Sequence, residues 1–155
     1  MLRHILCAGL ALSLPVTAAH ADNVALPFAA KADIAAAMAR ARANIQPGHG
    51  TSSTPLLALE AYTAKLEYHV GPNIANAHPQ QAELFQALEG SGTLITGGTI
   101  VKTATSAVIS GGTARTVAAG DVFIVPEGVP HWFSKVEGHL VMISVMLPRP
   151  TESAR

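Results

Sequence analysis

Two histidines and a glutamate combine side chains that divalent metal ions prefer as ligands. His78 and Glu83 are five residues apart, and they can converge only because Pro79-Gln80-Gln81 forms a turn between them. His131 follows a Pro-x-Gly turn at the start of another predicted strand. Two neutral imidazoles and one carboxylate on neighbouring strands bind a divalent cation on one face and leave its other positions open to water and substrate. The spacing therefore predicts a metal site.

Asn76 and the residues around the predicted ligands are candidates for further roles. Asn76 lies two residues before His78, so on a strand both side chains face the same way, and we expect Asn76 to be a fourth ligand or to orient water or substrate. Phe85 alternates with Glu83, and Phe133 with His131, which predicts an apolar wall around a small ligand. In the alternative interpretation, the polar residues satisfy one another inside a metal-free barrel, and the two phenylalanines are ordinary core.

Tyr68 and His69 lie on the strand that precedes this region, and they face opposite sides of it. A phenol or an imidazole near the mouth of a pocket can transfer protons, so both are candidate catalytic residues. The alternative is that each is simply a solvated side chain.

An amphipathic helix is predicted over residues 28–45. Ile34, Met38 and Ile45 fall on one face, with alanines between them, and Pro47-Gly48 ends the helix. We expect this helix to cover an edge or an open end of the main fold.

From Thr51 onward, short apolar or alternating runs stand between turns rich in glycine and proline. This texture, without intervening helices, predicts a β-sandwich or barrel. The predicted strands cover residues 56–59, 62–70, 74–77, 83–89, 92–96, 100–103, 107–109, 113–117, 122–125, 131–135 and 140–147.

One stretch of the chain resembles the first conserved motif of the cupin superfamily, the small double-stranded β-helix barrels also called jelly rolls. In that motif, a His-x-His pair is followed after three or four residues by a Glu, and after six more residues by a Gly. Here four residues separate His78 from Glu83, and six separate Glu83 from Gly90. Asn76 occupies the position of the first histidine of the pair.

A second stretch resembles the other cupin motif, which reads Gly, five residues, Pro-x-Gly, two residues, His. Gly120, Pro126, Gly128 and His131 match it at every position, whereas Lys135 replaces the Asn that often ends it. The resemblance covers residues 56–147. It implies an all-β jelly-roll barrel with one N-terminal helix, and a metal held by His78, Glu83 and His131.

Composition limits the function classes. The chain has 155 residues, which suits a single domain, and 49% of them are apolar, which suffices for a buried core. Only 13% are charged, and ten basic residues balance ten acidic ones. Such a chain has no basic patch for nucleic acid, and two-domain dinucleotide enzymes and multi-span membrane proteins fit it poorly.

The N-terminus is typical of a secretory signal peptide. Arg3 precedes an apolar stretch over residues 5–16, which is too short to span a membrane, and Ala19-His20-Ala21 offers a cleavage site before Asp22. Cleavage removes Cys7, the only cysteine, so the mature protein has no disulfide and no thiolate ligand. We expect an exported protein, periplasmic or secreted, that does not associate with a membrane after cleavage.

These observations predict four segments: a signal peptide (1–21), a helical segment (22–50), the barrel (51–148) and a flexible tail (149–155). A chain that crosses the membrane unfolded acquires its metal outside the cytoplasm, where intrinsic affinities favour copper and zinc over iron and manganese. Zinc suits two histidines and a carboxylate with an open position. We therefore expect zinc first, with iron, manganese, copper and nickel as alternatives. The resemblance implies a metal-dependent enzyme acting on a small organic molecule, of oxygenase, isomerase or lyase type. A non-catalytic module that binds a sugar-like ligand is the alternative, and a homodimer is the expected assembly.

Overall fold

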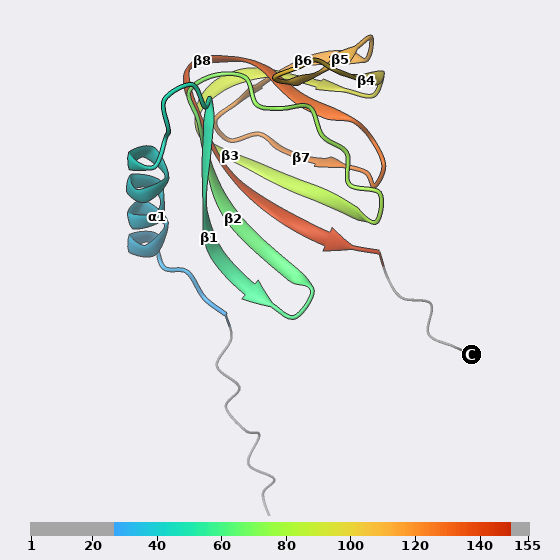
Figure 1. The fold of residues 1–155 in the computed structure, drawn as a ribbon. Coiled ribbons are helices and arrows are strands. Elements are labelled where there is room, and N and C mark those ends of the chain that lie inside the picture. The colour runs from blue at the N-terminus through green and yellow to red at the C-terminus, as the bar shows by residue number, and fades with distance from the viewer. Residues whose placement is uncertain (1–26, 150–155) are drawn as a thin grey trace, which may run out of the picture.

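The computed structural model describes residues 27–149, which form one helix followed by antiparallel strands (Figure 1). The prediction of an all-β fold with one N-terminal helix is confirmed within these residues. The elements are α1 (Lys31–Ala43), β1 (Thr51–Leu59), β2 (Tyr62–His69), β3 (Gln81–Thr96), β4 (Thr99–Lys102), β5 (Ala107–Ser110), β6 (Thr113–Ala118), β7 (Val122–Val125) and β8 (His131–Pro148). The predicted signal peptide lies outside the described residues, as does all but the first residue of the predicted tail. No helix within residues 27–149 is long and apolar enough to cross a membrane.

Two of the predicted strand boundaries are wrong because long strands bend where we expected them to stop. Residues 83–89 and 92–96 belong to the single strand β3, and residues 131–135 and 140–147 belong to the single strand β8. The pairing of β3 with β8 shifts register near Gly90 and continues on both sides of it. A β-bulge of this kind turns a strand without ending it.

The predicted strand at 74–77 is absent. In its place the chain makes one isolated bridge between Asn76 and His131. Pro72 and Pro79 flank this segment, and proline cannot donate to a strand ladder, so regular pairing does not extend through it. The segment therefore crosses the end of the sheet as a loop.

The principal sheet has the strand order β1-β2-β8-β3-β6, and β7 also pairs with β3. Both β6 and β7 lie against β3, β6 along its C-terminal half and β7 along its N-terminal half. The sheet curves strongly, and β7 lies beside β3 in it, while β4 and β5 form a separate two-stranded ribbon (Figure 1).

Gly90 permits one of the bends in β3. Its φ is +74°, and an added Cβ would collide with the backbone carbonyl of His139 on β8. Only glycine combines this left-handed backbone with so close an approach of the neighbouring strand. The glycine of the first cupin-like motif is thus explained by backbone geometry.

The core follows the two-residue period of the strands. Phe85 and Ala87 on β3 alternate with more exposed neighbours and are about 1% exposed, as the sequence predicts. The buried core cluster consists of Phe85, Ala87, Leu94, Val117, Val125, Phe133, Leu140 and Met142.

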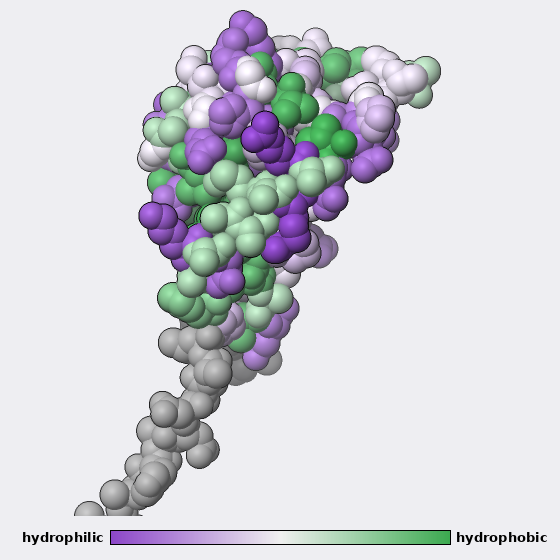
Figure 2. All heavy atoms as spheres, turned by 90° about the vertical axis from the view of Figure 1, so that its left-hand side faces the viewer, coloured by the Kyte–Doolittle hydropathy of each residue, from purple (hydrophilic) through white to green (hydrophobic). Residues whose placement is uncertain are grey.

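Helix α1 covers the outer face of β1 and β2 (Figure 1). Ala37 and Ala41 are fully buried against this face, with Ile34 and Met38 packed beside them, so the predicted apolar face is confirmed. Figure 2 looks at this side of the molecule, where hydrophilic residues are interspersed with apolar ones. The helix begins where the Asp33 carboxylate accepts a hydrogen bond of 2.9 Å from the Ala30 backbone N–H.

Candidate metal centre

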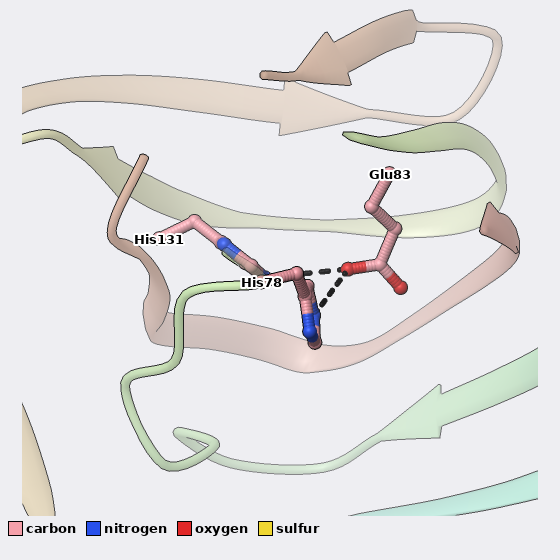
Figure 3. Close-up of side chains that lie close together, drawn as sticks. All are labelled: His78, Glu83 and His131. Atoms are coloured by element: carbon pink, nitrogen blue, oxygen red, sulfur yellow. Dashed lines mark ion pairs between the residues drawn. The ribbon is translucent and has the colours of Figure 1, made fainter. Parts of the chain in front are cut away.

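His78, Glu83 and His131 converge at one end of the curved sheet (Figure 3). The Nε2 atom of His78 lies 3.2 Å from Glu83 Oε2, and that of His131 lies 3.3 Å from the same oxygen. One potential ligand atom from each residue lies within 4.8 Å of the other two. The structure therefore brings together three side chains that the sequence spacing selects.

His78 lies in the loop between β2 and β3, and main-chain hydrogen bonds hold this loop in place. The Gly128 N–H donates to the His78 carbonyl at 2.8 Å, which ties the loop to the Pro-x-Gly turn. Asn76 and His131 exchange backbone hydrogen bonds of 3.0 and 2.8 Å. The two cupin-like motifs are thus joined directly through their backbones.

Glu83 and His131 come from the sheet itself. Glu83 lies on β3 between Val125 of β7 and Met146 of β8, and it is only 3% exposed. His131 opens β8, and its Nδ1 lies 3.4 Å from the Val129 carbonyl, which directs Nε2 toward Glu83. A hydrogen bond from one ring nitrogen commonly fixes the other for metal binding.

This arrangement fits a divalent cation. The carboxylate is buried, and the two imidazole nitrogens nearest to it belong to residues that bind metals when neutral. The side chain of His78 is 26% exposed, so the cluster has an opening to solvent. Three ligands with solvent access match a site that keeps positions for water or substrate.

Asn76 is placed differently from the sequence prediction. Because residues 74–77 form no strand, the prediction that Asn76 and His78 share a strand face is wrong. The Asn76 side chain is exposed, and its Oδ1 accepts a hydrogen bond of 2.8 Å from the Ala77 N–H. A contribution of Asn76 to metal or substrate binding stays a prediction.

Phe85 and Phe133 lie behind the cluster. The Phe85 ring contacts His131 edge-on with centroids 6.1 Å apart, and it meets Phe133 in the same way at 5.7 Å. On its other side Phe85 stacks on Phe123 of β7 at 5.0 Å. The aromatic rings thus form an apolar wall beside His131, as expected, and their contact with a ligand stays a prediction.

Tyr68 and His69 lie on opposite faces of β2, and neither is within the three-residue cluster. Tyr68 belongs to the apolar cluster beneath helix α1, and its ring stacks on His139 with centroids 5.9 Å apart. His69 faces the inside of the sheet, where it is 1% exposed and contacts Phe133 edge-on at 5.3 Å. Neither side chain is the solvated group of the alternative interpretation, and a catalytic role for either stays a prediction.

A second polar cluster inside the sheet was not predicted. Glu67 accepts a hydrogen bond from Ser144 Oγ at 2.7 Å, and it lies 3.0 Å from His69 Nε2 and 3.1 Å from Lys65 Nζ. Lys65 also lies 3.8 Å from Glu83 Oε1, so the two clusters are connected. The sequence signal was the alternation Lys65-x-Glu67-x-His69, which places three ionisable side chains on one face of the strand. Leu66 and Tyr68 between them lie on the opposite face, which packs beneath α1.

These contacts shift two pKa values. Burial opposes ionisation of Glu67, but the hydrogen bond from His69, the charge of Lys65 and the hydrogen bond from Ser144 outweigh it and lower the pKa of Glu67 to about 2. Burial also opposes the charged form of Lys65, but the carboxylates of Glu67 and Glu83 outweigh it and raise the pKa of Lys65. Both groups are therefore charged at neutral pH.

Comparison with known proteins agrees with this fold. No curated protein matches the chain. Among solved structures, KdgF from Halomonas sp. is 15% identical with a TM-score of 0.53, over 70% of this chain and 86% of that one. The protein TT1209 from Thermus thermophilus is 19% identical with a TM-score of 0.53, over 69% and 90% of the two chains. At these identities the likeness concerns the fold alone, and with it the jelly-roll prediction is confirmed.

A family model described as "Cupin" matches residues 51–152, which include every strand and all three residues of the candidate metal centre. The match begins at the first residue of β1 and extends beyond β8. The sequence motifs, the curved sheet and the family match agree, and the chain belongs to the cupin family.

Proposed function

We propose that the protein is a metal-dependent enzyme that acts on a small organic molecule. The observation that carries the proposal is the convergence of His78, Glu83 and His131, whose ligand atoms lie within 4.8 Å of one another at a solvent-accessible site. The three residues would hold the ion, which as a Lewis acid would polarise a bound oxygen atom or supply an activated water. The aromatic wall of Phe85 and Phe133 would exclude water from the side of His131.

A cavity lies beside strand β7, and none of His78, Glu83 and His131 lines it. Its volume is about 460 Å³, and its lining includes Phe123 and Val125 of β7 together with Leu94 and Val117 of the buried core. Phe123 stacks on Phe85, and Val125 pairs with Glu83 across the strands. The cavity therefore adjoins residues that pack against the site, and its lining also includes the charged side chains of Arg115 and Asp121.

Zinc is the proposed metal, and export is part of that proposal. A chain that folds outside the cytoplasm binds metals according to its intrinsic affinities, which favour copper and zinc over iron and manganese. Two histidines and a carboxylate with an open position suit zinc. Metal analysis of protein isolated from its native compartment tests the identity, and predominant iron would contradict it. Intact mass of the same sample tests the export, since cleavage before Asp22 removes residues 1–21.

Metal content of purified variants tests the site. We expect about one zinc per chain in the wild type and little in His78→Ala and Glu83→Ala, because each loses one of three ligands. His139→Ala is the matched control, since His139 also lies near a glutamate, Glu89, at 3.6 Å, but outside the cluster. Unchanged metal content in both ligand variants would remove the proposed site.

A non-catalytic module that binds a sugar-like ligand is the second candidate. Asn76 favours it, because the family motif has a histidine at this position and here the amide oxygen is occupied by the Ala77 N–H. Ligand binding by such a module would survive both chelator treatment and Glu83→Ala. Loss of binding under both treatments would exclude this candidate.

The proposed assembly is a homodimer. Val122 and Ile124 on β7 are 62% and 53% exposed, and a second chain could cover them. Sedimentation of the mature protein tests the proposal, and a monomer at high micromolar concentration would contradict it.

A further inference from the structure

Lys65 places a positive charge beside the candidate metal centre. It lies on β2, with its ammonium 3.1 Å from Glu67 Oε1 and 3.8 Å from Glu83 Oε1. The Lys65 side chain remains 42% exposed, whereas those of Glu67 and Glu83 are only 12% and 3% exposed. An ammonium has three N–H donors, so Lys65 keeps donor capacity for a group that enters from solvent.

The ion pair with Glu67 fixes the position of the Lys65 ammonium. Glu67 holds the ammonium, and Glu67 is itself held by Ser144 at 2.7 Å and by His69 at 3.0 Å. Ser144 pairs with Lys65 across β2 and β8, so the tether is part of the sheet. A lysine whose carboxylate partner is anchored in this way loses little further freedom when it binds an anion.

The net charge around Lys65 would favour binding of an anion once a metal ion is bound. Glu67 and Glu83 carry two negative charges, and Lys65 offsets one of them. A divalent cation held by neutral His78 and His131 together with Glu83 would leave one positive charge in excess. A buried or half-buried excess charge is costly unless an opposite charge accompanies it.

We infer that Lys65 binds the anionic group of the small molecule at the candidate metal centre, and that this molecule is a carboxylic acid. The inference rests on the proposed function. One carboxylate oxygen would take an open position of the ion, and the other would accept a hydrogen bond from the Lys65 ammonium. Charge-assisted hydrogen bonds of this type are shorter and stronger than neutral ones, which makes Lys65 specificity-determining for an acid over its amide.

The test measures anion binding separately from metal binding. The protein is loaded with Co²⁺, and the shift of its visible absorption band is followed during titration with acetate at constant ionic strength. Acetamide serves as the neutral isostere. For the wild type we expect saturable binding of acetate and none of acetamide at the same concentrations.

Variants assign the effect to Lys65. Lys65→Gln is expected to raise the Kd for acetate about tenfold, in keeping with the loss of one hydrogen bond between charged groups. Lys65→Arg is expected to retain binding within about threefold, because it keeps the charge. Lys102→Gln on exposed β4 is the matched control and should leave the Kd unchanged.

The outcomes separate the two proposals. Cobalt uptake without acetate binding, or an equal Kd in wild type and Lys65→Gln, would overturn the inference and leave the proposed metal site in place. Failure of the wild type to take up cobalt would overturn the proposed function and the inference with it. The Lys65 ammonium resonance of the wild type provides a second readout that needs no variant. It should shift with acetate at the same midpoint, and a constant resonance would contradict the inference.

Discussion

Glu67 and Glu83 are two glutamates inside the same sheet, and their surroundings differ. Glu67 has partners at 2.7, 3.0 and 3.1 Å, which are a hydroxyl, an imidazole and an ammonium. The nearest side-chain nitrogens to Glu83 lie at 3.2, 3.3 and 3.8 Å, and two of them are imidazole nitrogens of potential metal ligands. Glu67 is thus surrounded by close donors, and Glu83 by longer contacts.

The difference favours the proposed metal site at Glu83. A buried carboxylate is tolerated when hydrogen bonds and opposite charges replace its lost hydration. Glu67 meets this condition within the chain. Glu83 is more buried, at 3% against 12% for the Glu67 side chain, yet its partners are more distant. A cation would bring an opposite charge closer to Glu83, and this comparison favours the proposed metal centre over polar residues that satisfy one another.

The largest expected effect is on stability without metal. In chelator-treated protein at pH 8, Glu67→Gln should lower the free energy of unfolding by about 3 kcal/mol, because the neutral amide replaces a carboxylate that has charge-assisted contacts with Ser144 and Lys65. Glu83→Gln should change it by less than about 1 kcal/mol, because the contacts of Glu83, at 3.2 to 3.8 Å, are longer than those of Glu67. Urea unfolding measures both. A cost for Glu83→Gln equal to that for Glu67→Gln would remove the distinction.

The second prediction concerns the pH dependence of stability that Glu67 causes. Its pKa falls from 4.5 to about 2 on folding, so its contribution to stability is complete above pH 4.5 and is lost as the pH falls toward 2. The wild type should lose on the order of 3 kcal/mol of unfolding free energy across this window through Glu67 alone. Glu67→Gln should lack that part of the loss. Denaturant unfolding at several pH values measures it, and parallel curves for the two proteins would contradict the assignment.

The two glutamates also differ in how far the sequence could reveal them. Glu83 belongs to a motif with His78 and Gly90, and this spacing predicted its place beside two histidines. Glu67 belongs to no motif, and one of its partners, Ser144, is 77 residues away on β8. The pairing of β2 with β8 sets that contact, and strand order cannot be read from the alternation of side chains along one strand.

Similar limits apply to the fold. The all-β class, helix α1 and strand β7 (Val122–Val125) followed from local patterns. The continuity of β3 and β8 did not, because Gly90 was interpreted as a turn signal and the structure uses it for a bend between paired strands. The predicted orientation of Asn76 was wrong for a related reason. Residues two apart face the same way only within a strand, and the prolines on either side of Asn76 prevent a strand from forming there.

The third prediction concerns stabilisation by zinc, which should depend on Glu83 and not on Glu67. Added at 100 times its Kd, it should stabilise the wild type by about 2.7 kcal/mol, because it binds the folded state. Glu67→Gln should retain this increment, and Glu83→Gln should lose it. Thermal unfolding with and without zinc measures the increment. An equal gain in Glu83→Gln would show that the ion binds elsewhere.

The smallest expected effect comes from one donor of the Glu67 network. Ser144→Ala removes the hydrogen bond of 2.7 Å to Glu67 but leaves Lys65 and His69 in place, so it should cost about 1.5 to 2 kcal/mol. Ser134→Ala is the control on the same strand, since its hydroxyl donates to the Thr93 carbonyl at 3.3 Å, and it should cost less than about 1 kcal/mol. Urea unfolding of both variants measures the difference. If Ser144→Ala were as mild as Ser134→Ala, water would be able to replace the serine, and Glu67 would be less enclosed than its contacts indicate.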